Sequence, residues 1–244
     1  MRVTLTLLAL AALIWPNVGM AQDLGFALAD DGSLTNRTIQ LIALLTVLSL
    51  APGIAIMVTC FPFIITVFAI LRQALGLQQS PPNMLLVSLA MFLTYFVMEP
   101  VFVTAWEQGI DPLMRGELEM EVAFARTIEP LRGFMTGRIA ADTLGHLASL
   151  RPDLDPNTTA ETAPLSLVIP SFLLSEMERA FQVGFVIFLP FLIIDLVVAA
   201  VLMSMGMMMV PPAIVSLPFK LAFFVVADGW ALLSRSLVEG YAPF

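Results

Sequence analysis

The chain has 244 residues, of which 59% are hydrophobic and 12% are charged, and its net charge at pH 7 is −8. Soluble globular domains are about 45–50% apolar and about 25% charged, so the composition excludes an ordinary soluble domain and indicates an integral membrane protein. The negative net charge argues against nucleic acid as a partner, because nucleic-acid binding relies on clusters of basic side chains.

The first residues have the form of a secretory signal sequence. Arg2 provides a positive start, residues 3–15 form a short apolar core, and Gly19 and Ala21 are small residues at positions −3 and −1 of a cleavage site after Ala21. We expect a cleavable signal peptide over residues 1–21. The alternative is an uncleaved anchor, for which the apolar core is short. Residues 22–244 then form a single membrane domain.

Two apolar segments follow in the first half of the chain. The first, about residues 39–71, exceeds the about 20 residues of one bilayer crossing. Pro52 and Gly53 interrupt it, which predicts a kinked helix or two helical pieces. The second covers about residues 84–104 and carries Glu99 near its end.

The stretch of about residues 107–170 differs in composition from its surroundings. It mixes acidic and basic side chains, and residues 114–150 have helix-compatible spacing. This pattern predicts one or two amphipathic helices outside the bilayer. We expect the next helix to begin at Ser171, which has a side chain suited to an N-cap, with Glu176 on its polar first turns.

The last third of the chain contains two further apolar segments, about residues 181–203 and 213–233. With the earlier pair they give four long apolar segments. The predicted fold is therefore an all-α membrane protein made of helical hairpins, with an amphipathic helical segment outside the membrane between the two pairs.

Four ionisable residues lie inside the apolar segments. An ionisable side chain in lipid is costly, so each is expected to face a helix bundle, a partner or water. One interpretation makes them packing or assembly pairs, and the other makes them the lining of a conduit or a proton relay. Asp195 and Lys220 lie on consecutive segments and can pair. The four residues are Glu99, Asp195, Lys220 and Asp228.

Between the last two apolar segments the chain reads SMGMMMVPP over residues 204–212. Flexible apolar thioethers at a helix break suit lipid-facing or core filler, a Cu(I) site, or a soft seal at the throat of a polymer channel. Copper sites usually also recruit Cys or His, and neither is near. The candidate seal residues are Met205, Met207, Met208 and Met209, and the candidate hinge residues are Gly206, Pro211 and Pro212.

The sequence does not favour an enzyme. It contains no nucleotide-binding loop and no Gly-x-Ser-x-Gly motif. Asp195 and Asp228 lack the Gly-x-Gly-Asp pattern of intramembrane aspartyl proteases. Cys60 and His146 are each the only residue of their type in the chain. We expect no catalytic residues, no cofactor and no metal.

Several longer blocks resemble the FliP family of flagellar type III export proteins. They are LSLAPGIAIMVTCF, LRQALGLQQSPPN, SEMERAFQVGFVIFLPFLIIDLVVAAVLMSMGMMMVPP and SLPFKLAFFVVADGW. The resemblance covers about residues 41–104 and 171–233. It departs at Pro62 and Phe63, where the family usually has Thr-Arg.

The resemblance implies the pore-forming subunit of the flagellar export gate in the bacterial inner membrane, within the flagellar basal body. It implies a homo-oligomer assembled with FliQ-like and FliR-like subunits and other export-apparatus membrane proteins, which conducts unfolded flagellar subunits. It also implies that the methionine-rich loop, with Met205 and residues 207–209, is a gasket around the pore. The alternative function is a small-solute or Cu(I) membrane transporter.

Overall fold

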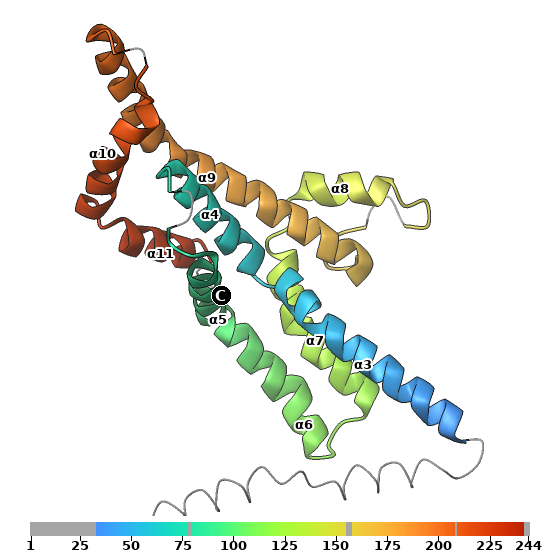
Figure 1. Ribbon diagram of the computed structural model, residues 1–244. Helices are drawn as coiled ribbons and strands as arrows, with labels where there is room; N and C mark the ends of the chain where they lie inside the picture. The colour runs from blue at the N-terminus through green and yellow to red at the C-terminus, as the bar shows by residue number, and fades with distance from the viewer. Residues whose placement is uncertain (1–32, 78–79, 155–157, 208, 242–244) are drawn as a thin grey trace, which may run out of the picture. The chain divides into compact units, whose positions relative to one another are not determined.

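The computed structural model describes residues 33–77, 80–154, 158–207 and 209–241 (Figure 1). The predicted signal peptide, residues 1–21, and the side chain of Met208 lie outside them. The described residues contain helices and no strand, which confirms the all-α class. The helices are α3 (Ser33–Met57), α4 (Phe61–Ala74), α5 (Asn83–Ala105), the π-helix η1 (Trp106–Ile110), α6 (Asp111–Met114), α7 (Met120–Thr136), α8 (Ala141–Ser149), α9 (Leu165–Ser204), α10 (Pro212–Val226) and α11 (Gly229–Glu239).

The chain divides into two compact units between Pro52 and Gly53. The described part of the first unit belongs to α3, and apolar side chains on it, including Ile42 and Leu45, are exposed. The second unit, residues 53–244, contains α4 to α11 and the hydrophobic core.

Three helical stretches in the described residues are long and apolar enough to cross a membrane: Thr38–Met57, Asn83–Met114 and Leu165–Ser204. Helices α10 and α11 form a fourth candidate if the bent pair is one span. Exposed apolar helices of this length need lipid or protein partners, since a monomer in water rarely exposes such large apolar patches.

The first apolar segment breaks at a different place from the one expected. Helix α3 continues past Pro52, and the chain leaves helical geometry only at residues 58–60 before α4 begins. Pro62 lies in the first turn of α4, where its missing N–H has no helical partner to lose. The Thr59 hydroxyl donates to the Ile56 carbonyl (3.0 Å), so a side chain satisfies an acceptor at the end of α3.

The expected start of the long helix at Ser171 is wrong. Helix α9 has Pro164 as its N-cap and runs for 40 residues, and Ser171 is fully buried inside it. Leu167, Val168 and Phe172 belong to the core. Burial of this apolar face therefore decides where the helix begins, although Pro170 lies within it.

The last apolar segment is two helices that meet at an angle of 61°. Asp228 lies at the bend with φ 48°, a left-handed conformation that Asp tolerates better than most residues. Gly229 follows, and a Cβ there would lie 2.2 Å from the Phe224 ring. The glycine thus lets the aromatic ring pack against the bend.

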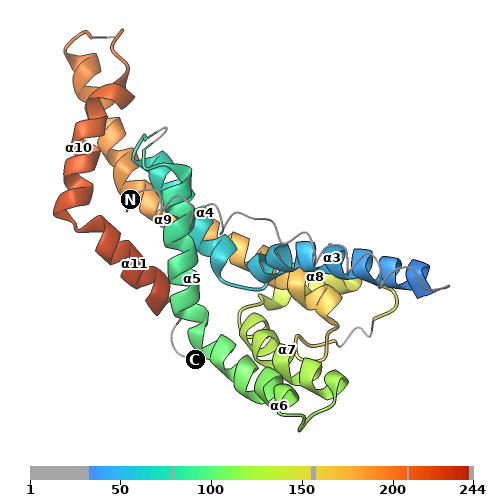
Figure 2. The same ribbon diagram turned by 60° about the horizontal axis from the view of Figure 1, so that its bottom comes forward.

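Residues 106–149 form η1, α6, α7 and α8. Helix α7 contacts α5, η1 and α9, and α8 contacts α9 (Figures 1 and 2). The contact between η1 and α7 is close, because a Cβ on Gly109 would meet the Thr127 side chain at 2.0 Å and the Ala123 carbonyl at 2.8 Å.

Helices α4 and α9 form the main packing contact of the second unit, and they run side by side in both views (Figures 1 and 2). The buried face of α4 includes Ile64, Phe68 and Leu71, at helical spacing. Gly184 allows α9 to approach, since a Cβ there would lie 2.3 Å from Cδ1 of Ile70.

We predict that Gly184→Ala destabilises the α4–α9 contact by about 1–3 kcal/mol, as overpacking of a close contact usually does. Ile70→Val in the same chain should recover much of the loss, because it removes the Cδ1 atom that the new methyl group meets. The thermal unfolding midpoint of the detergent-purified protein measures both effects.

Gly145→Ala in α8 is the matched control. Nothing lies within 4 Å of its Cβ position, so the midpoint should stay the same or rise slightly. Equal destabilisation by Gly184→Ala and by Gly145→Ala would contradict the close-approach explanation.

Candidate functional site

The methionine-rich connector is the segment between α9 and α10, residues 205–211, and it begins where a C-capping motif ends α9. The Met207 amide donates to the Leu202 carbonyl (3.0 Å), and the Gly206 amide donates to the Met203 carbonyl (3.0 Å). These two bonds form a Schellman motif, in which a residue of positive φ ends the helix. Gly206 has φ 76°, a conformation that costs other residues about 1–2 kcal/mol.

The connector ends at two prolines that begin the next helix. Pro211 is the N-cap of α10 and Pro212 is its first residue, where the fixed φ of proline already matches the helix. The Val210 amide donates to the Met207 carbonyl (3.4 Å). The backbone of the connector is therefore fixed at both ends by local geometry.

The described methionines of this connector point away from the chain's own core. Met205 is 67% exposed, Met207 is 42% exposed and Met209 is 97% exposed. Nothing is described for the side chain of Met208. Exposure of this degree argues against core filler and leaves the connector available to lipid, metal or another chain.

Asp195 of α9 and Lys220 of α10 form an ion pair between the two helices that the connector joins. Nζ of Lys220 lies 2.6 Å from Oδ2 of Asp195 and donates to the Ala74 carbonyl at 2.9 Å. The Ser216 hydroxyl donates to Oδ1 of Asp195. Lys220 is 5% exposed, whereas the Asp195 side chain is 36% exposed.

This network joins three helices. The Ala74 carbonyl belongs to the last turn of α4, where acceptors have no helical partner and the helix dipole favours a cation. Lys220 therefore serves α4 as a C-terminal cap and α9 as a counter-ion. The contact also holds the middle of α10 against α9, and so limits where the methionine connector between the two helices can lie.

The other two ionisable candidates lie apart from this pair. Glu99 is exposed on α5, and Asp228 is exposed at the bend between α10 and α11. Neither forms an ion pair with another described residue. Asp228 has an evident backbone role, whereas Glu99 is an unpaired carboxylate on an otherwise apolar helix.

A second buried ionic cluster was not predicted from the sequence. Nε of Arg138 donates to Oε1 of Glu176 (2.8 Å), and Nη1 of Arg138 donates to the Gly240 carbonyl (3.2 Å). The Tyr241 hydroxyl donates to the other oxygen of Glu176. Cζ of Arg138 lies 3.8 Å from the centre of the Tyr241 ring.

This cluster holds the end of α11 against α9 and the turn before α8. Glu176 is fully buried, so its charge depends on these partners. Burial and the Glu176 carboxylate raise the pKa of the Tyr241 phenol, which therefore remains a hydrogen-bond donor. The only signal of this cluster in the sequence is Glu176, an acidic residue in a helix that continues as an apolar span.

Comparison with known proteins shows clear similarity. A model of the FliP family matches residues 44–237. The flagellar biosynthetic protein FliP of Caulobacter vibrioides is 50% identical over 236 residues, which cover 96% of this chain and 88% of that protein. The protein of the same name from Rhizobium meliloti is 48% identical over 86% of each chain, and that from Bacillus subtilis is 42% identical over 87% of this chain and 96% of its own length.

For the ion pair, we predict that Asp195→Asn lowers the free energy of unfolding by about 3 kcal/mol. Lys220→Met should cost less than Asp195→Asn. It leaves the partly exposed Asp195 carboxylate, which keeps its contacts with solvent and the Ser216 hydroxyl, whereas Asp195→Asn leaves the more buried Lys220 ammonium without a counter-ion. The double variant should recover part of the loss. A larger loss from Lys220→Met, measured by thermal unfolding, would contradict this ranking.

For the second cluster, we predict that Tyr241→Phe lowers stability by about 2 kcal/mol, since it removes a hydrogen bond to a fully buried carboxylate. Tyr95→Phe on α5 is the control, because Tyr95 is 60% exposed. Limited proteolysis at the C-terminus and the unfolding midpoint report the change. If the two variants behave in the same way, the hydrogen bond from Tyr241 to Glu176 does not hold the end of α11, and the prediction is contradicted.

Proposed function

The chain belongs to the FliP family and is a component of the flagellar export apparatus, and from this premise we propose that it is the pore-forming subunit of the type III export gate. In this proposal it conducts unfolded flagellar subunits across the bacterial inner membrane at the flagellar basal body. It acts without catalysis, cofactor or metal.

The observation that carries the proposal is the methionine-rich connector. Its backbone is fixed by Gly206 and Pro211–Pro212, while the described methionine side chains from 205 to 209 are exposed. A channel for a polymer needs a constriction that holds its position but changes shape around different side chains. Methionine suits this role because its thioether is apolar and its chain has three rotatable bonds.

The proposed gasket works by apolar contact. When several copies surround a common axis, their methionines close a ring that excludes water and ions. A passing polypeptide displaces the side chains, and these repack on its surface. The gasket residues are Met205, Met207, Met208 and Met209, with Gly206, Pro211 and Pro212 as the hinge.

Exposed surface supports assembly with other chains. Helix α5 exposes large apolar side chains, including Met84, Phe92 and Phe96, and carries the unpaired Glu99 on the same helix. A carboxylate on a lipid-facing surface is costly, so we assign Glu99 to a contact with another subunit or with water. The partners are further copies of this chain and FliQ-like and FliR-like subunits.

Asp195 and Lys220 have a supporting role in this proposal. Their network connects α9, α10 and the end of α4, which are the elements nearest the connector. We assign them to positioning the gasket within one subunit. Asp228 positions the bend between α10 and α11 through its backbone conformation.

We predict that replacing residues 207–209 together by Leu preserves most swimming motility, because the apolar bulk of the ring remains. Replacing them by Gly should make cells leak small ions while the complex still assembles. Patch-clamp conductance of membranes that contain the complex measures the leak, and soft-agar swimming measures export.

Met114→Gly and Met120→Gly serve as controls, since these methionines are also exposed but lie on α6 and α7. Their conductance should match that of the unmodified protein. A leak that is the same in control and connector variants would refute the gasket. Loss of Cu(I) uptake in the Leu variant, with normal swimming, would instead identify a metal transporter.

A further inference from the structure

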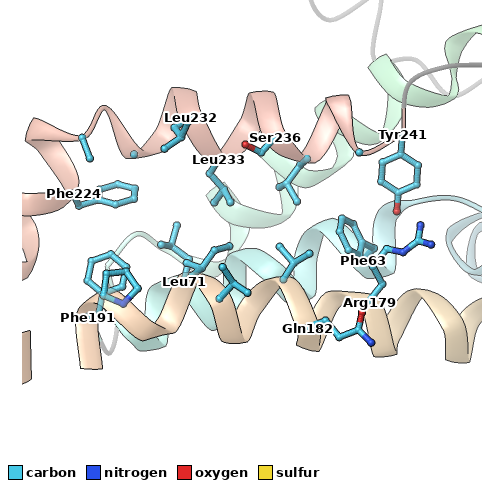
Figure 3. A pocket seen from close by; sticks show the side chains of 18 of the residues that line it. Phe63, Leu71, Arg179, Gln182, Phe191, Phe224, Leu232, Leu233, Ser236 and Tyr241 are labelled. Carbon is cyan, nitrogen blue, oxygen red and sulfur yellow. The ribbon is translucent and has the colours of Figure 1, made fainter. Parts of the chain in front are cut away.

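A cavity of about 620 Å³ lies between α9 and the bent pair α10–α11 (Figure 3). Its volume falls within the about 300–1,000 Å³ of typical small-molecule sites. The walls are almost entirely aliphatic and aromatic. They include Val183, Val186 and Ile187 of α9, and Leu232, Leu233 and Leu237 of α11.

The two ends of the cavity differ in polarity. Figure 3 shows Arg179 and Gln182 at one end, and Phe191 and Phe224 at the other. Two arginines, Arg138 and Arg179, line the cavity, and no acidic residue does. The cavity is therefore an apolar pocket with a polar end, where Arg179 lies 3.8 Å from the Glu176 carboxylate and the Gln182 amide donates to Glu178 at 3.1 Å.

The two arginines are not equally available to a ligand. Arg138 is buried and donates to Glu176 and to the Gly240 carbonyl. The Arg179 guanidinium lies 3.8 Å from the same Glu176 oxygen, and its side chain is 43% exposed. It makes no hydrogen bond to another described residue. Arg179 therefore forms a long ion pair with Glu176 and keeps hydrogen-bond donors that another anion at the polar end can use.

The length of the cavity matches one leaflet of a bilayer. Arg179 and Phe191 are twelve positions apart on α9, which at 1.5 Å per residue places them about 18 Å apart along the helix. Half of the bilayer hydrocarbon core is about 15 Å. An acyl chain with its phosphate at Arg179 would therefore end near Phe191.

Burial along α9 places Arg179 at a boundary. The buried residues of α9 are concentrated between Leu167 and Gly184, and after Gly184 only Phe191 and Leu202 are buried. The first part of the helix thus has one face covered by protein, although Leu174 and Phe181 on it are exposed, and the second part exposes apolar side chains such as Val186 and Ile193. A cation at this transition is at the depth expected for lipid headgroups.

We propose that this cavity binds an anionic phospholipid, with one acyl chain between α9 and α11 and the phosphate at Arg179 and Gln182. This inference rests on the membrane placement in the proposed function. The bound lipid fills the space behind the α9–α10 connector and so supports the angle between the two helices.

A second copy of the chain is the competing occupant. A helix from another subunit can fill the apolar part of the cavity, but it has to place an acidic side chain opposite Arg179. A phospholipid satisfies both requirements in one molecule, and lipid is present wherever these helices are inserted. The Arg179 donors that no other described residue uses therefore favour the lipid.

The test uses the full-length chain, purified in detergent and depleted of lipid, then titrated with dioleoyl phosphatidylglycerol or dioleoyl phosphatidylcholine and examined by native mass spectrometry. One phosphatidylglycerol should be retained per chain, in preference to phosphatidylcholine. Arg179→Gln should reduce this retention about tenfold, as expected for loss of a charge-assisted hydrogen bond, and Arg179→Lys should restore part of it.

Two further variants separate the cavity from the general lipid surface. Val183→Trp, which places a bulky ring at a partly buried wall position, should abolish retention of both lipids. Arg235→Gln removes an exposed arginine of α11 that does not line the cavity, so it should change nothing. Equal retention of the two lipids by the unmodified chain, or unchanged retention in Arg179→Gln, would overturn the proposal.

A photo-crosslinking residue at Val183, a partly buried position in the cavity wall, introduced in the assembled complex in native membranes, gives an independent readout. A phospholipid adduct supports the proposal, and a crosslink to a second copy of the chain overturns it. The ion leak of the connector variants does not depend on this result, so failure of the lipid site and failure of the gate can be distinguished.

Discussion

The structure depends on the need to neutralise two carboxylates on one long apolar helix. Helix α9 carries Glu176, which is fully buried, and Asp195, which is partly buried. A buried carboxylate without a partner costs several kcal/mol, so each requires a cation from elsewhere in the chain. Arg138 comes from before α8 and Lys220 from α10. These two pairings fix where along α9 the turn before α8 and helix α10 lie.

Ion pairs of this kind add little net stability compared with an apolar core, but they can fix register. Sliding α10 along α9 would separate Lys220 from Asp195 and from the Ala74 carbonyl together. The connector between these helices is therefore fixed in position, although its described methionine side chains, Met205, Met207 and Met209, are exposed. A rigid backbone with exposed, adaptable side chains is the combination that the proposed gasket needs.

The sequence predicts some of this arrangement and not the rest. The ion pair between Asp195 and Lys220 can be predicted, because each residue interrupts an apolar segment. The hydropathy pattern alone therefore shows that each charge needs a partner. The pair of Arg138 and Glu176 cannot be predicted in this way, because both lie among other charged residues and only the tertiary fold buries them. Gly206 and the two prolines predict a helix break correctly, whereas the true start of α9 at Leu165 depends on core burial rather than on a local cap.

The length of α9 connects these features. Forty residues span about 60 Å as a helix, about twice the hydrocarbon thickness of a bilayer. Tilt alone accommodates only a small excess, so much of α9 has to lie outside the hydrocarbon or inside protein. Its first half is the part that α7 and α8 contact and that Arg138 neutralises, whereas its second half exposes apolar side chains up to the methionine connector. The amphipathic helices α7 and α8 thus supply protein cover to the first half of α9, which gives the acidic segment before this long apolar helix a structural role.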